Sequence, residues 1–172
     1  IKSETAIPRL IKLLEDEDSS VRCRTAYALG EIKSETAIPR LIKLLEDEDL
    51  FVSDSAANAL GKIKSETTIP GLIKLLEHEN SSVGTMSANA LGEIKSETSI
   101  PGLIKRLEDK DSSVRFMSAM ARGQMKSKPA TSRTLNRSEH EDSSLRKSAA
   151  IALGKIKSET AIPRLIKLLE DE

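Results

Sequence analysis

Apolar residues along the chain follow two alternating helical patterns. Over residues 7–14 they recur every three or four positions, on one face of a helix: Ile7, Leu10, Ile11 and Leu14. Over residues 21–29 a second stripe has the same kind of spacing: Val21, Thr25, Ala28 and Leu29. The acidic run at 15–18 separates the two stripes. The pattern therefore predicts two short helices joined by a tight polar turn.

Candidate capping residues mark the ends of both predicted helices. Ser3 or Thr5 can cap the first helix, and Pro8 falls in its first turn, where a missing N–H costs little. Asp18 is a suitable N-cap for the second helix, because its charge favours the positive end of the helix dipole. Gly30 stands where a left-handed C-terminal cap is expected.

The same pair of patterns returns along the whole chain. The run Ile-Lys-Ser-Glu-Thr starts at residues 1, 32, 63, 94 and 156, and glycines stand at 30, 61, 92, 123 and 154. This predicts five 31-residue units and a half unit: 1–31, 32–62, 63–93, 94–124, 125–155 and 156–172. One helix pair cannot bury its apolar faces alone, so we expect the units to stack. The predicted fold is an all-α solenoid of antiparallel helix pairs.

Composition excludes several classes of function. Lys and Arg number 27, as do Asp and Glu, so the chain lacks the basic excess that favours nucleic-acid binding. No run approaches 18 apolar residues, which argues against a membrane span. The one cysteine, Cys23, excludes an intrachain disulfide and fits a reducing, cytoplasmic location. With no Trp, one Tyr and two Phe, an aromatic cofactor pocket is hard to build, so no cofactor is expected.

The run from Asp18 to Gly30 reads Asp-Ser-Ser-Val-Arg-Cys-Arg-Thr-Ala-Tyr-Ala-Leu-Gly and resembles short HEAT repeats of the phycobilisome-lyase type. The run from Ala6 to Leu14 resembles the same family, and the resemblance covers the whole chain. It implies a HEAT-like superhelix with Arg–Asp contacts between successive units. Arg22, Arg115 and Arg146 fit that pattern, whereas Ser53 and Gly84 interrupt it. The family includes bilin lyase subunits, a di-iron hydroxylase, scaffolds fused to NTPase modules and engineered binders, so the resemblance leaves the function open.

Some positions of the second helix differ from unit to unit while the apolar positions stay constant. The variable positions, equivalent to 20, 23, 24, 27 and 31, share one helical stripe, which the resemblance places on the inner surface. We interpret the stripe as a binding surface for a protein or peptide, since clustered Met and Phe suit adaptable contacts. The alternatives are drift at exposed positions and packing between units. The candidate residues are Cys23, Arg24, Tyr27, Asp54, Asn58, Met86, Asn89, Phe116, Met117, Met120, Lys147 and Ile151.

Residues that could support catalysis have simpler interpretations. His78 and His140 fall in inter-helix turns two units apart, on the order of 20 Å, which is too far to share a metal ion. Cys23 could be a nucleophile or a bilin carrier, but an ordinary helix-surface thiol explains it as well. No catalytic residue and no metal site are predicted. The leading function is a protein-interaction scaffold, and the alternative is a bilin lyase or chaperone-like subunit.

Two regions depart from the regular array. Unit five lacks the first apolar stripe, with Thr131, Thr134, Leu135 and Ser138 in its place, and is either a functional loop or a degenerate repeat. We expect residues 126–139 to have the lowest protection from hydrogen exchange. The last predicted helix, 162–169, repeats the internal consensus and would expose an apolar face. We therefore expect a fragment of a longer array that self-associates end to end.

Overall fold

The computed structural model describes residues 6–107 and 109–124. Unit five and the half unit, including Lys147, Ile151 and the segment 126–139, lie outside the described residues, so the predictions made for them stay predictions. The described helices are α1 (Ala6–Leu13), α2 (Ser19–Ile32), α3 (Ile38–Lys43), α4 (Leu50–Ile63), α5 (Ile69–Leu75), α6 (Ser81–Ile94), α7 (Ile100–Arg106) and α8 (Ser112–Gln124). Short 3-10 turns span Glu35–Ala37, Leu44–Glu46, Glu66–Thr68 and Glu97–Ser99.

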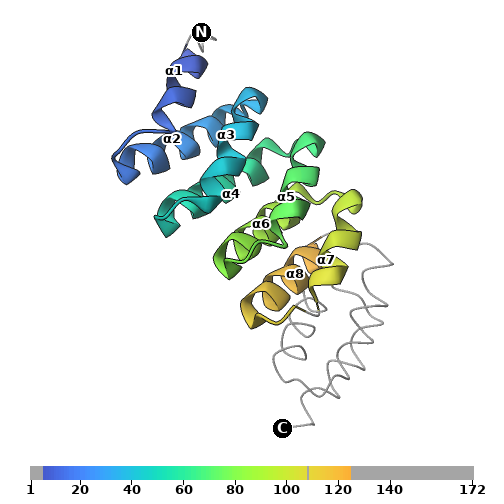
Figure 1. The fold of residues 1–172 in the computed structure, drawn as a ribbon. Coiled ribbons are helices and arrows are strands. Elements are labelled where there is room, and N and C mark those ends of the chain that lie inside the picture. The colour runs from blue at the N-terminus through green and yellow to red at the C-terminus, as the bar shows by residue number, and fades with distance from the viewer. Residues whose placement is uncertain (1–5, 108, 125–172) are drawn as a thin grey trace.

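The helices form two layers, as Figure 1 shows. The second helix of each unit packs against the second helix of the next, so that α2, α4, α6 and α8 make one layer. The shorter first helices α1, α3, α5 and α7 make the other. Over the described residues the chain contains no strand. The prediction of an all-α solenoid is confirmed.

One apolar core runs through all four described units. Its largest fully buried side chains are leucines at equivalent repeat positions: Leu14, Leu29, Leu45, Leu60, Leu76 and Leu91. Units one to three each add leucines from both halves of the unit to this cluster. Unit four adds Leu103 and Ala121, while Leu107 and Ala119 form a small cluster beside it. This continuity is what a stack of helix pairs requires for stability.

The second helices begin as the sequence predicts. The Asp18 carboxylate accepts a hydrogen bond from the Ser20 N–H at 2.8 Å, and Asp49 accepts from the Phe51 N–H at 2.8 Å. Asn80 serves α6 in the same way, accepting from the Ser82 N–H at 2.9 Å. These bonds satisfy amide groups that have no partner within the helix.

The second helices end later than predicted, and a different residue caps them. Helix α2 continues past this glycine to Ile32, and the left-handed residue is Lys33, with φ 56°. Its backbone N–H donates to the Gly30 carbonyl at 3.0 Å. Lys64 and Lys95 repeat the conformation with φ 55° and 60°, and no described glycine has a positive φ. The expectation that Gly30 is the left-handed cap is therefore wrong.

The glycine is needed for packing instead. A Cβ atom on Gly30 would lie 2.7 Å from the Cα atom of Ala59 in the neighbouring helix α4. A Cβ on Gly92 would lie 2.8 Å from the Cα of Ala121 in α8. Real Cβ contacts are not that short. The second helices thus pack so closely at these points that only hydrogen fits.

We predict that Gly30→Ala lowers the free energy of unfolding, because the added methyl group forces α2 and α4 apart. Overpacking of this kind costs about 1–3 kcal/mol. The matched control is Gly71→Ala in α5, where the new methyl meets only the Ile42 side chain, whose flexible Cδ1 end is nearest at 3.0 Å. Urea denaturation followed by circular dichroism measures both. Equal stability of the two variants would contradict the packing role.

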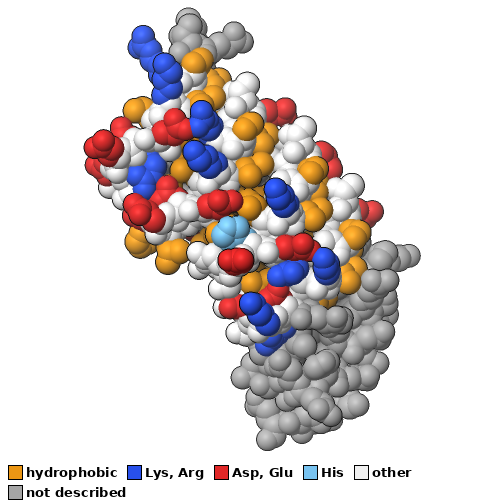
Figure 2. Space-filling model, viewed as in Figure 1, with side chains coloured by type: hydrophobic (Ala, Val, Ile, Leu, Met, Phe, Trp, Pro, Cys, Tyr) orange, Lys and Arg blue, Asp and Glu red, His pale blue; other side chains and the backbone are white. Residues whose placement is uncertain are grey.

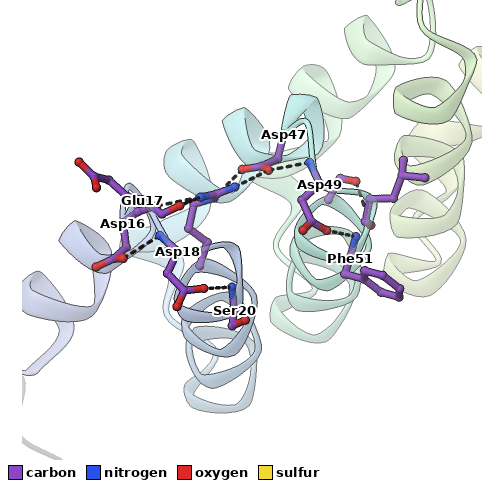
Figure 3. A network of polar contacts seen from close by, with 10 residues as sticks. Asp16, Glu17, Asp18, Ser20, Asp47, Asp49 and Phe51 are labelled. Atoms are coloured by element: carbon purple, nitrogen blue, oxygen red, sulfur yellow. Dashed lines mark hydrogen bonds and ion pairs between the residues drawn. The ribbon is translucent and has the colours of Figure 1, made fainter.

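A polar network joins unit one to unit two at the inter-helix turns (Figure 3). Arg22 forms a bidentate ion pair with Asp47, in which Nε and Nη2 each lie 2.8 Å from a carboxylate oxygen. Its Nη1 atom also donates to the carbonyls of Asp16 at 2.8 Å and Glu17 at 3.0 Å. The Asp47 hydrogen bond raises the pKa of Arg22 above its ordinary value. One side chain therefore holds two turns together, as the family resemblance implies.

The later units replace this link. Ser53 stands in the equivalent place to Arg22, and its hydroxyl donates to the Leu50 carbonyl at 3.1 Å within its own helix. Gly84 provides no side chain to pair with Asp109. That carboxylate instead pairs with Arg106, which occupies a position held by leucine in the earlier units. The Arg–Asp link between neighbouring units is thus replaced by a contact within unit four.

We predict that Arg22→Ala destabilises the chain more than Arg40→Ala. Arg22 and Asp47 have side chains only 11% and 8% exposed, and removal of one partner leaves the other without compensation in a shielded site. Arg40 pairs with Glu15 in solvent, where ion pairs contribute little. Thermal unfolding at low and high salt measures the difference. An equal drop in midpoint for both variants would contradict the link.

Candidate binding surface

The variable positions of the second helices lie along one side of the α2–α4–α6–α8 layer. We call the set equivalent to positions 20, 23, 24, 27 and 31 the second-helix stripe. On α2 and α4 it is open to solvent: Phe51 is 80% exposed and Tyr27 is 59% exposed. Arg24, Asp54 and Asn58 are exposed as well. The part of the stripe carried by units one and two is therefore accessible to a partner.

The stripe is more deeply buried on α6 and α8. Its methionines and Phe116 are half-buried, and Met86 and Met117 pack against the core, as does Cys23. Packing between units, the alternative that the sequence left open, thus applies to Met86 and Met117, and a binding role for these residues, Phe116 and Met120 stays a prediction. The direction of position 24 accounts for this burial. Ser55 occupies position 24 in unit two, and its hydroxyl contacts the Cys23 Sγ atom of unit one at 3.0 Å. Side chains here face the neighbouring second helix.

A hollow of about 380 Å³ lies on the stripe between the N-terminal halves of α2 and α4. Cys23 and Arg24 belong to its α2 wall, and Phe51 belongs to its α4 wall. Figure 3 shows the Phe51 ring directed away from the turn network. The full lining is Ser19, Ser20, Cys23, Arg24, Asp49 and Phe51. Phe51 lies on the predicted stripe, but it was not among the candidate residues. The signal that could have identified it is its contrast with Ser20, Ser82 and Ser113 at the equivalent positions.

The two charged side chains at this hollow, Asp49 and Arg24, differ in whether they are free to pair with a partner. The Asp49 carboxylate accepts hydrogen bonds from the Ser19 side chain and the Phe51 N–H, which lower its pKa below the ordinary value. Arg24, by contrast, is exposed and forms no ion pair with any of the described residues. The hollow thus offers a partner one free cation beside one exposed aromatic ring.

A second contact between units fixes the neighbouring part of the stripe. The Lys62 ammonium group of α4 lies 4.5 Å from the centroid of the Tyr27 ring of α2. It also pairs with Glu31, whose hydrogen bond raises the pKa of Lys62. A cation over an aromatic face is favourable. Tyr27 is therefore held in a defined position while more than half of its surface stays exposed.

A larger hollow of about 550 Å³ lies on the turn side of units one and two. Its charged lining includes the two ion pairs Arg22–Asp47 and Arg40–Glu15. Figure 2 shows acidic side chains gathered near these turns, with basic side chains interspersed on the same face. Because its main charges already neutralise each other, this hollow is a weaker candidate than the one beside Phe51.

The residues that could have been metal ligands or catalytic groups have structural roles instead. His78 is exposed in a turn, where its Nδ1 atom accepts a hydrogen bond from the Asn80 N–H at 3.1 Å. The Asp47 carboxylate does the same for the Asp49 N–H at 3.0 Å. Within residues 6–107 and 109–124 no group of three or more His, Cys, Asp or Glu could hold a metal ion. No helix in that part of the chain is long and apolar enough to cross a membrane.

We predict that Asp49→Asn makes stability less sensitive to acid. A carboxylate with a lowered pKa stabilises the fold fully above its unfolded pKa, near 3.8, and loses that effect as the pH falls through the lower folded pKa. Asn retains the cap, as Asn80 shows, but does not titrate. Thermal midpoints measured from about pH 5 to pH 2 should fall less steeply for the variant. A parallel fall would contradict this role of Asp49.

Comparison with known proteins places the chain in a family. The family model for HEAT repeats matches residues 1–57, 52–121, 69–138 and 100–172. These matches together extend over the whole sequence. The chain therefore belongs to the HEAT-repeat family. No curated protein sequence matches it.

Several solved structures are similar to this chain. The complex of CpcE and CpcF of phycocyanin lyase from Nostoc sp. PCC7120 has a TM-score of 0.67 at 28% identity, over 91% of this chain and 66% of that one. The chain thus spans slightly less than two thirds of that relative. An engineered protein gives a TM-score of 0.52 at 26% identity, over 96% and 85%. A designed armadillo repeat protein in complex with the peptide (KR)4 gives 0.56 at 19% identity, over 96% and 88%, and shows the shared fold alone.

Proposed function

We propose that this chain is a protein-interaction scaffold that binds a protein or peptide along the second-helix stripe of units one and two. The observation that carries the proposal is Phe51, 80% exposed at the edge of a hollow on a packed helix layer. A large apolar ring held in water by a rigid element is costly unless a partner covers it. Binding energy at protein interfaces concentrates on such aromatic anchors.

The repeat architecture supports this function. The residues that stack the units are nearly constant, whereas the stripe changes from one unit to the next. A rigid surface of this kind loses little conformational freedom on binding, which favours affinity. HEAT and armadillo-type repeat scaffolds are suited to protein binding, and a designed armadillo relative was solved with a peptide.

The hollow suggests the chemistry of the bound segment. An apolar side chain would fill the space between Cys23 and the Phe51 ring. An acidic group beside it would pair with the free guanidinium of Arg24, an interaction strengthened by paired hydrogen bonds. We therefore propose a segment that carries an apolar residue next to Asp or Glu.

We predict that Phe51→Ser weakens binding on the order of tenfold or more, the effect expected of a central anchor. Serine stands at the equivalent positions 20, 82 and 113, so the fold should be unchanged. Peptides selected from a random display library on the wild-type chain provide the ligand, and fluorescence anisotropy measures affinity. The control is Leu13→Ser, which removes an apolar side chain 40% exposed on a first helix.

The same selection tests the charge preference. Peptides selected on the wild type should be enriched in Asp or Glu beside an apolar residue, and Arg24→Glu should reverse the preference to Lys or Arg. Selected peptides that bind both Phe51→Ser and Arg24→Glu as tightly as the wild type would contradict the proposed surface.

The second candidate function is a bilin lyase or chaperone-like subunit, favoured by the similarity to the CpcE–CpcF complex. Cys23 lines the hollow, but its Sγ atom already contacts the Ser55 hydroxyl and it is half-buried. A change in bilin absorbance on mixing the chain with bilin and a phycobiliprotein would favour this function. An unchanged spectrum, together with a selected peptide that needs Phe51, would favour the scaffold.

A further inference from the structure

The open part of the second-helix stripe is longer along the helices than across them. On α4, which packs between α2 and α6, the stripe is exposed at Phe51, Asp54 and Asn58. On α6 the equivalents of the last two, Thr85 and Asn89, are half-buried. A partner therefore finds its open surface over α2 and α4, and the long direction of that surface follows the two helices.

Helices α2 and α4 lie side by side and in register (Figure 1). Near their N-terminal ends Cys23 contacts Ser55, which stand at positions 23 and 24 of their units. Near their C-terminal ends Glu31 pairs with Lys62, and both stand at position 31. A difference in repeat position between the two helices thus translates directly into a distance along them.

Two exposed aromatic rings mark this surface. Phe51 stands at position 20 of its unit and Tyr27 at position 27, and they are 80% and 59% exposed. Seven residues of α-helix rise by about 10 Å, so the rings are separated by roughly that distance along the helix direction. The Lys62 ammonium group over the Tyr27 ring holds it in place, 4.5 Å from the ring centroid.

The exposure of position 27 is a property of the repeat. Asn58 occupies this position on α4 and is exposed, although a second helix packs on each side of α4. Tyr27 is therefore not accessible merely because α2 has only one described second helix beside it. Both rings belong to the open side of the layer.

The surface offers side chains but no free backbone. The backbone N–H and C=O groups in the middle of α2 and α4 are bonded within the helices. The Asn58 side-chain amide donates to the Asp54 carboxylate at 3.1 Å. An extended segment would bring unpaired backbone groups onto this surface, which is costly, whereas a helix satisfies its own. The surface therefore favours a helical partner.

We propose that the bound segment is an amphipathic α-helix of a partner protein, lying along α2 and α4 with one apolar residue on Phe51 and another, seven positions away, on Tyr27. Residues i and i+7 of a helix share a face and are about 10 Å apart, which matches the rise between the two rings. The inference rests on the proposed function and adds the conformation of the partner and Tyr27 as a second anchor.

The charge on this surface fits the same helix. Arg24 stands between positions 20 and 27, four residues from one and three from the other. An acidic residue of the bound helix that pairs with Arg24 would thus lie three or four positions from each apolar anchor. Such residues are neighbours on one helical face. The expected motif is an apolar residue, Asp or Glu three or four positions on, and a second apolar residue at the seventh.

Variants of Tyr27 test the second anchor. The probes are peptides of about 18 residues, or five helical turns, selected on the wild-type chain from a random display library. Tyr27→Asn introduces the residue of Asn58 and Asn89, so the fold should be unchanged, and we expect binding weaker on the order of tenfold. Tyr27→Phe keeps the ring and should bind as the wild type does. Fluorescence anisotropy measures both.

A change in the peptide tests the helix. Proline placed between the two apolar anchors interrupts a helix, so binding should weaken tenfold or more, whereas alanine at the same place should be tolerated. Circular dichroism should show that the wild-type peptide gains helix on binding.

The outcomes separate this inference from the proposed function. Phe51-dependent peptides that bind Tyr27→Asn as tightly as the wild type, or that tolerate the central proline, would overturn the helical partner and leave the scaffold function standing. Peptides that bind both Phe51→Ser and Arg24→Glu as tightly as the wild type, or a selection that yields no binding peptide, would overturn the proposed function and this inference with it.

Discussion

The close approach of consecutive second helices is the constraint on which most of this structure depends. At Gly30 and Gly92 a single methyl group would reach the backbone of the next helix, so the layer is built with hydrogen at its tightest points. Close packing of that kind buries the alanine and leucine stripes of units one to three in one continuous core, which Leu103 and Ala121 extend into unit four. It also leaves the exposed positions of the second-helix stripe, such as Tyr27 and Phe51, on the side of the layer that faces solvent.

The units keep the packing constant but vary the polar links between them. Arg22 joins two turns through one guanidinium group, whereas unit three has no such side chain and Arg106 neutralises Asp109 from within unit four. His78 replaces an aspartate yet keeps its hydrogen bond to the turn backbone. Local turn geometry is therefore conserved more strictly along the array than the bonds from unit to unit, which is consistent with stability that comes mainly from the apolar core.

The proposed binding surface is a consequence of the same architecture. On the second-helix stripe, a rigid layer presents Phe51 and Arg24 beside a hollow. A repeat protein gains a modular surface through near-identical units.

The sequence by itself determined the helix pairs, their spacing and the N-cap Asp18, because these depend on contacts within a few residues. It also located the stripe, since helical periodicity fixes which positions share a face. Only the tertiary structure decided what each position does. Gly30 matched a cap signal, yet the neighbouring helix requires it for packing and Lys33 takes the left-handed conformation. Met86 and Met117 belong to the stripe, yet they are half-buried against the core, because burial is decided by neighbours distant in sequence.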